Sequence, residues 1–88
     1  MKDKSGILYI VSTPIGNLSD ITYRGIDILD FVDFIAAEDT RQSKKILLHY
    51  NFTTSLISYH ENNSYKQIPV LINKLNSGNN IALISDAG

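Results

Sequence analysis

Acidic, basic and imidazole side chains gather directly after two apolar runs of this chain. Glu38, Asp39 and Arg41 follow the first of these runs, and His60 follows the second. A carboxylate or a neutral imidazole can accept a proton, and a guanidinium can hold a substrate phosphate. These four residues are therefore the candidates for a catalytic site.

Each candidate also has a structural interpretation that the sequence leaves open. The two carboxylates stand where a helix begins, and there they would interact favourably with the helix dipole. His60 has no cysteine or second histidine at metal-ligand spacing, so it is either a base or a hydrogen-bonded turn residue. Arg41, Lys44 and Lys45 share one helical face, which we interpret as solvated rather than as a contact for RNA phosphates.

Two further segments have the composition of ligand-binding loops. The stretch 12–18 contains Pro14, which fixes its own φ, and Gly16, which permits a positive φ or the close approach of a ligand. Asn17 adds an amide on which a small polar molecule could dock. The second segment, 85–88, places an acid and a glycine after another apolar run. Its acid could accept hydrogen bonds from ribose hydroxyls or an ammonium group, although a plain turn would suit it equally.

Four apolar runs alternate with three stretches of helical periodicity, which predicts the order βαβαβαβ. We expect strands at about 6–11, 33–37, 55–59 and 81–84, and helices at about 20–31, 40–50 and 64–77. Ser19 or Asp20 can cap the first helix. The alternation is typical of an α/β fold with a mostly parallel β-sheet flanked by helices. Because the carboxyl ends of parallel strands share one edge, the four polar turns should converge there.

Other residues mark where the second and third helices should end or begin. Asn51 is the expected stop of the second helix. Ser64 and Gln67 have capping-box spacing for the third helix. Pro69 falls inside that helix and should kink it or delay its start to about Gln67. Gly78 should end it as a cap residue.

The composition limits the class of protein. The chain has 88 residues, 43% of them hydrophobic, a formal net charge of −1 and no cysteine. Disulfides and thiolate metal sites are thereby excluded, and no apolar stretch is long enough to cross a membrane. Neither a P-loop nor a G-x-G-x-x-G motif is present. We expect a soluble cytoplasmic protein with no membrane contact and no metal.

Five segments, taken in order, form one composite motif: Tyr9–Leu18, Asp20–Thr22, Ala36–Arg41, His60–Asn63 and Ser85–Gly88. Together they resemble the tetrapyrrole methylase superfamily, specifically its ribosomal RNA small subunit methyltransferase I branch, over nearly the whole chain. The resemblance implies a class III methyltransferase with two α/β domains, usually a homodimer, that binds S-adenosylmethionine between the domains. On this basis residues 1–88 are a truncated N-terminal domain whose C-terminal partner domain is absent, and the segment alone should be inactive.

The resemblance also implies roles for individual residues. Cofactor binding is implied for Pro14, Gly16, Asn17, Asp86, Ala87 and Gly88. The substrate side is implied for Glu38, Asp39, Arg41 and His60. The implied reaction is methylation of a cytidine ribose 2′-hydroxyl in small-subunit ribosomal RNA. Asn62 stands where the family often has a second histidine, which argues against a two-histidine mechanism. Two alternatives stay open: a methylase of a small tetrapyrrole of the precorrin type, and a non-catalytic nucleotide-binding or interaction module.

Overall fold

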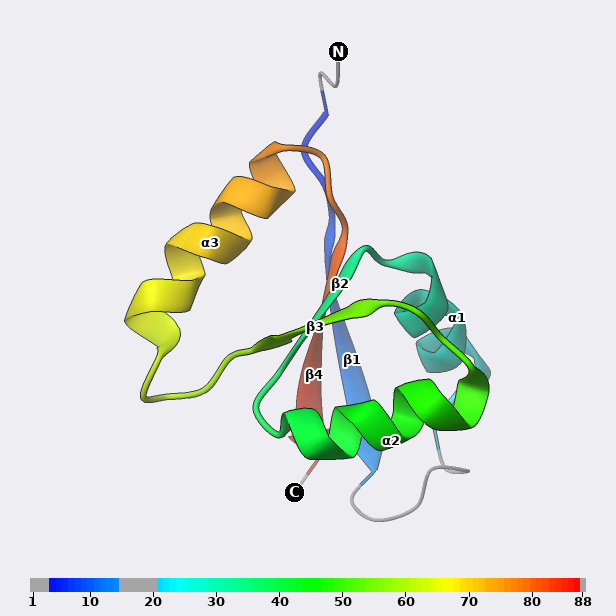
Figure 1. The fold of residues 1–88 in the computed structure, drawn as a ribbon. Coiled ribbons are helices and arrows are strands. Elements are labelled where there is room, and N and C mark those ends of the chain that lie inside the picture. The colour runs from blue at the N-terminus through cyan, green and yellow to red at the C-terminus, as the bar shows by residue number, and fades with distance from the viewer. Residues whose placement is uncertain (1–3, 15–20, 88) are drawn as a thin grey trace.

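The computed structural model describes residues 4–14 and 21–87 of the chain (Figure 1). Its elements are β1 (Leu8–Pro14), α1 (Tyr23–Phe31), β2 (Phe34–Ala37), α2 (Thr40–Tyr50), β3 (Ser55–Ser58), α3 (Ser64–Asn76) and β4 (Ile81–Ala87). This is the βαβαβαβ order that the hydrophobic pattern predicts. Within the described ranges, no helix is long and apolar enough to cross a membrane.

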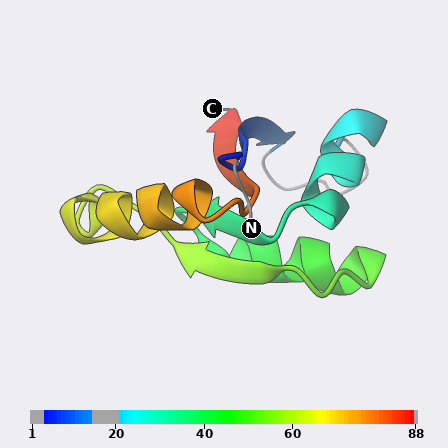
Figure 2. The same ribbon diagram turned by 90° about the horizontal axis from the view of Figure 1, so that it is seen from above.

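The four strands form one parallel sheet in the order β1-β4-β2-β3. The last strand in the sequence therefore lies between β1 and β2, and β1 and β3 form the two edges. Helices α1 and α2 cover one face of the sheet and α3 covers the other (Figure 2). A parallel sheet covered on both faces explains why its strands read as short, nearly continuous apolar runs. The predicted fold class is confirmed.

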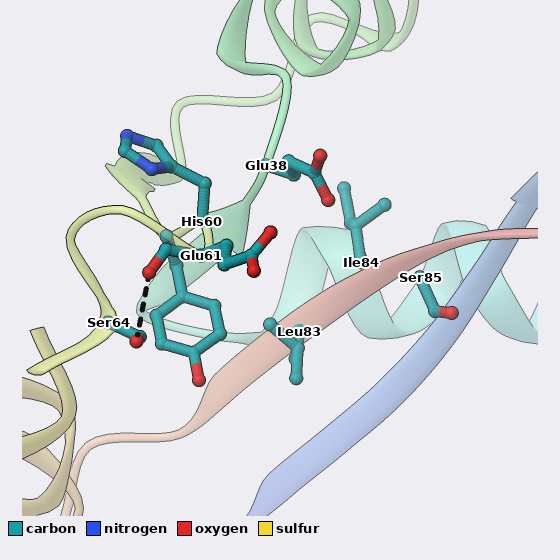
Figure 3. Close-up of a pocket in the computed structure, with 8 residues that line it drawn as sticks. Glu38, His60, Glu61, Ser64, Leu83, Ile84 and Ser85 are labelled. Carbon is teal, nitrogen blue, oxygen red and sulfur yellow. Dashed lines mark hydrogen bonds between the residues drawn. The ribbon is translucent and has the colours of Figure 1, made fainter.

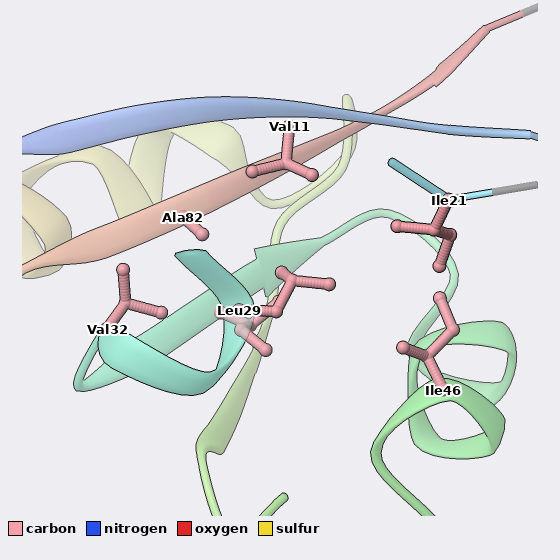
Figure 4. Packing of buried hydrophobic residues seen from close by; sticks show 7 residues of the cluster. Val11, Ile21, Leu29, Val32, Ile46 and Ala82 are labelled. Atoms are coloured by element: carbon pink, nitrogen blue, oxygen red, sulfur yellow. The ribbon is translucent and has the colours of Figure 1, made fainter. Parts of the chain in front are cut away.

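Two apolar clusters hold the helices to the sheet. The cluster beneath α1 and α2 consists of Val11, Ile21, Leu29, Val32, Ile35, Ile46 and Ala82 (Figure 4). On the opposite face, Leu71 of α3 packs with Ala36 and Ile81. Successive strand residues, such as Ile81 and Ala82, thus point to opposite faces, as the pleat requires. The sheet is therefore held between helices on both of its faces.

β1 and β4 are longer at their carboxyl ends than predicted. The sequence pattern predicts loops for segments 12–14 and 85–87, but in the structure they continue the pairing, with Thr13 opposite Asp86 and Pro14 opposite Ala87. A proline lacks the N–H needed in a central strand, but an edge strand such as β1 tolerates it. The other ends differ slightly, since β1 begins at Leu8 rather than Gly6.

The first helix begins later than predicted. Its N-cap is Thr22, whose Oγ1 accepts a hydrogen bond from the N–H of Gly25 at 3.0 Å. Ser19 and Asp20, the predicted caps, lie outside the described residues. Three cap-forming residues within four positions made the choice undecidable from residue type alone.

The second helix has the predicted bounds, and the predicted ends of both later helices are confirmed. Asn51, with φ of 58°, adopts the left-handed conformation after α2. Gly78, with φ of 89°, follows the end of α3. Such residues allow the last helical carbonyls to be satisfied while the chain turns away.

The third helix differs from the prediction at its start. α3 begins at Ser64 and continues through Pro69, so the delayed start is wrong. Its N-cap is Asn63, so the predicted capping box of Ser64 with Gln67 is also wrong. Gln67 Nε2 instead donates to a carbonyl at the end of β3 at 2.9 Å. This tether and the burial of Leu71 offset the cost of an interior proline, about 3 kcal/mol.

Candidate active site

A pocket of about 400 Å³ opens at the carboxyl edge of the sheet (Figure 3). It is lined by Glu38, Tyr59, His60, Glu61, Ser64, Leu83, Ile84 and Ser85. The lining residues belong to β4, to the turns after β2 and β3 and to the first position of α3, so three of the four polar segments converge as the parallel sheet predicts. Ser12, from the remaining segment, lines a separate hollow between β1 and α1.

The topology explains why a pocket forms here. The helix after β2 covers one face of the sheet, and the helix after the neighbouring β3 covers the other face. Two adjacent strands whose helices leave toward opposite faces have a crevice between their carboxyl ends, and open α/β sheets bind ligands in such crevices. Glu38 follows the end of β2 and His60 follows the end of β3, so both residues border this crevice.

Two carboxylates dominate the chemistry of the pocket. Glu38 and Glu61 are exposed, and their side chains point toward the same space from the turns after β2 and β3 (Figure 3). The imidazole of His60 turns away from both carboxylates in that view. Over residues 4–14 and 21–87, no group of three histidine, aspartate or glutamate side chains is arranged to hold a metal ion.

Asp39 and Arg41 lie beside the pocket and do not line it. Asp39 is the N-cap of α2, and its Oδ1 accepts from the backbone N–H groups of Arg41 at 3.0 Å and Gln42 at 3.4 Å. Its Oδ1 also lies 3.7 Å from Nε of Arg41, whose side chain is 91% exposed. The capping interpretation of Asp39 is therefore confirmed. A direct catalytic role for either residue stays a prediction.

The turn between β3 and α3 is held by side-chain amides. Asn63 Oδ1 accepts from the backbone N–H of His60 at 2.8 Å, and Asn63 Nδ2 donates to the carbonyl of Ser58 at 3.1 Å. Gln67 Nε2 donates to the same carbonyl at 2.9 Å. The backbone N–H of Asn62 donates to Nδ1 of His60 at 3.2 Å. His60 is thus positioned through its backbone and its ring.

These positioning residues are hard to identify from residue types alone. Asn63 occurs in the composite motif, but its residue type did not reveal that it would join His60 to the end of β3. The spacing of Gln67 predicts a capping box with Ser64, whereas in the structure its side chain donates to Ser58. The sequence pattern places Tyr59 at the end of a strand, and in the structure Tyr59 lines the pocket.

The predicted cofactor residues are described only in part. β1 and β4 bring Pro14 beside Ala87, one register step beyond Thr13 and Asp86. The backbone thus sets the two predicted ligand-binding segments side by side at the same edge as the pocket. The remaining predicted residues, Gly16, Asn17 and Gly88, lie outside the described ranges. Cofactor binding by all six stays a prediction.

Residues 7–88 match the family model described as tetrapyrrole (corrin/porphyrin) methylases. The chain is 58% identical over 87 residues to the ribosomal RNA small subunit methyltransferase I of Bacillus subtilis, covering 99% of this chain and 30% of that protein. It is 55% identical over 89 residues to the protein of the same name from Streptococcus pyogenes serotype M6, covering 99% and 31%. For the Synechocystis sp. protein of that name, identity is 55% over 83 residues, covering 94% and 30%. The chain spans about 30% of the length of these curated relatives.

Proposed function

This chain belongs to the tetrapyrrole methylase family, and we propose that it forms the N-terminal domain of a ribosomal RNA methyltransferase. The observation that carries the proposal is identity of 55–58% to proteins named for methylation of small-subunit ribosomal RNA. The proposed substrate group is a cytidine ribose 2′-hydroxyl, in keeping with the resemblance of the sequence to that branch. The full-length enzyme is proposed to work as a cytoplasmic homodimer.

The proposed cofactor is S-adenosylmethionine. When bound, it would supply an activated methyl group on a positively charged sulfur. The pairing of β1 with β4 supports this proposal, because it sets Pro14 and Ala87 next to each other at the ligand-binding edge. The backbone of Asp86 lies one step away, and an aspartate suits ribose hydroxyls or an ammonium group. Gly16, Asn17 and Gly88 would complete the set.

A ribose hydroxyl is a weak nucleophile unless a base removes its proton. We assign this role to Glu38, which lines the pocket and whose carboxylate has no hydrogen-bond partner among the described residues. Asp39 is a poorer candidate because its Oδ1 already accepts two backbone N–H groups. The exposed guanidinium of Arg41 is available to hold a phosphate next to the target nucleotide.

A chimera tests this proposal. In it, this chain replaces the matching segment of the Bacillus subtilis relative, so that the pocket is joined to the remaining part of that relative. We expect transfer of a labelled methyl group from S-adenosylmethionine to a ribose of the RNA in unmodified small ribosomal subunits. Glu38→Gln should lower the rate by about 10²–10⁴-fold, the usual contribution of a general base.

The matched control is Asp30→Asn, which neutralises an exposed acid on α1 and should leave the rate unchanged. A folded chimera that binds S-adenosylmethionine by calorimetry but leaves the ribosomal RNA unlabelled would refute the proposed substrate. Labelling of a small tetrapyrrole in its place would support the alternative within the same family. An unchanged rate for Glu38→Gln would refute the assignment of the base.

A further inference from the structure

We propose that His60 acts as a neutral hydrogen-bond donor through Nε2, toward an oxygen acceptor of the RNA, and does not serve as the base. This inference rests on the proposed function, since it assigns a role within the same pocket. The sequence left two roles open for His60, a base or a hydrogen-bonded turn residue, and this inference excludes the base. It also leaves proton removal to a carboxylate.

The hydrogen bond to the ring determines where its proton lies. Nδ1 of His60 accepts from the backbone N–H of Asn62 at 3.2 Å, so Nδ1 carries no proton in this arrangement. A neutral imidazole has one protonated nitrogen and one lone pair. The proton of His60 therefore lies on Nε2, and the lone pair is already engaged. While this contact exists, neither nitrogen can take a proton from a substrate. Nε2 already carries a proton, and a proton on Nδ1 would point at the N–H of Asn62.

The turn keeps the Asn62 amide in place. The backbone N–H of His60 donates to Asn63 Oδ1 at 2.8 Å, and Asn63 Nδ2 donates to Ser58 at 3.1 Å. The carbonyl of His60 also accepts from the N–H of Asn63 at 3.1 Å. The His60 N–H is thus tied to the end of β3 through Asn63, and the Glu61 carbonyl, in the same peptide group as the Asn62 N–H, accepts from Ser64 Oγ at 3.3 Å. To free the Nδ1 lone pair, the ring must rotate away from the Asn62 N–H or the turn must open.

The ring of His60 stands apart from the carboxylates of the pocket (Figure 3). The ionisable side chains that line the same pocket are Glu38, Glu61 and Tyr59. Among the described residues, no carboxylate lies within ion-pair distance of His60, and the ring turns away from both glutamates (Figure 3). A neutral ring with an outward Nε2–H suits an uncharged donor role. Phosphate and carbonyl oxygens of an RNA strand are the acceptors that such a donor would meet.

The proton position can be measured without any activity. We expect a two-bond ¹H–¹⁵N correlation spectrum of the 88-residue chain at neutral pH to show a protonated Nε2 and an unprotonated Nδ1 for His60. The other histidine, His49, is exposed on α2 and provides the reference in the same spectrum. A protonated Nδ1 in His60, as the other tautomer or as imidazolium, would overturn the inference.

Three substitutions in the chimera separate a donor from a base. The terminal amide of His60→Gln can donate near the position of Nε2 but has no basic nitrogen. His60→Asn keeps an acceptor near the position of Nδ1 and loses the distal donor, and His60→Ala loses both. We expect His60→Gln to keep the methylation rate within about tenfold of the parent. The other two should lose about 10–100-fold, as for a hydrogen bond to a charged group.

The alternative results are distinct. A base would make all three variants fall equally, by about 10²–10⁴-fold, and that result would overturn the inference. Three variants with the full rate would overturn it too, because the donor would then be unnecessary. If the parent chimera itself does not methylate ribosomal RNA, the proposed function fails, while the spectrum of the chain still reports on the ring.

Discussion

Removing Asn63 and Gln67 together should destabilise the fold by more than the sum of the two separate changes. Both side-chain amides donate to the carbonyl of Ser58, at 3.1 and 2.9 Å. This carbonyl is at the end of edge strand β3 and is half-buried. After either single substitution one donor is left, whereas after both the carbonyl has no side-chain donor.

The magnitudes follow from the bonds that are lost. A net hydrogen bond contributes about 0.5–1.5 kcal/mol to stability. Gln67→Ala removes one such bond. Asn63→Ala removes two, because it also takes away the acceptor of the His60 N–H, so its expected cost is about 1–3 kcal/mol. The double variant adds the penalty of an unsatisfied carbonyl, which predicts a coupling energy of about 1 kcal/mol.

Urea denaturation of the four proteins in the cycle, followed by circular dichroism, gives these free energies of unfolding. Asn73→Ala is the matched control, since Asn73 is an exposed amide on the same helix and has no side-chain contact with Ser58. It should combine additively with Asn63→Ala. If Asn63→Ala and Gln67→Ala also add within about 0.3 kcal/mol, the shared carbonyl is not what links the turn to the strand.

Three further predictions concern stability and are read by thermal or urea denaturation. Leu29→Ala removes a fully buried side chain and should lower the free energy of unfolding by about 2–5 kcal/mol. Leu48→Ala, at a side chain 78% exposed, should change it by less than about 0.5 kcal/mol. Similar losses for the two variants would contradict the described core. Asp39→Ala should lower the free energy of unfolding by about 0.5–2 kcal/mol, because the N-cap of α2 is lost. Asp39→Asn keeps a capping oxygen and should lower it clearly less. Equal losses would point to a role for the charge of Asp39. Gly6→Ala would drive its new Cβ into the backbone carbonyl of Asn79, and we expect a loss of about 1–3 kcal/mol; an unchanged midpoint would show that this contact is not made.

The order of elements was predictable because each strand is a short apolar run that ends in polar residues. The order of strands within the sheet was not. Nothing in the run Ile81–Ile84 distinguishes a strand inserted between β1 and β2 from one added at an edge. The convergence of the polar turns could still be predicted, since it depends only on the strands being parallel.

The candidate site was predictable by position and less so by role. Glu38 and His60 could be found because they directly follow strands. Whether Asp39 caps a helix, or whether the ring of His60 keeps a free lone pair, depends on hydrogen bonds of about 3 Å that residue types do not specify. The extension of β1 through Pro14 was missed for a related reason, because an edge strand tolerates a residue that a central strand excludes.

The position of β4 has a consequence for how the chain folds during synthesis. Within the described residues, β1 pairs with β4 alone, and the Ile7 N–H bonds Asn80 across 73 positions of sequence. β2 and β3, by contrast, are joined by α2 alone and pair directly with each other. Of the four strands, β1 is synthesised before the others and its partner β4 after them, and such non-local pairing is slow. Until residues 81–87 are available, β1 is an unpaired apolar segment open to chaperones or to aggregation.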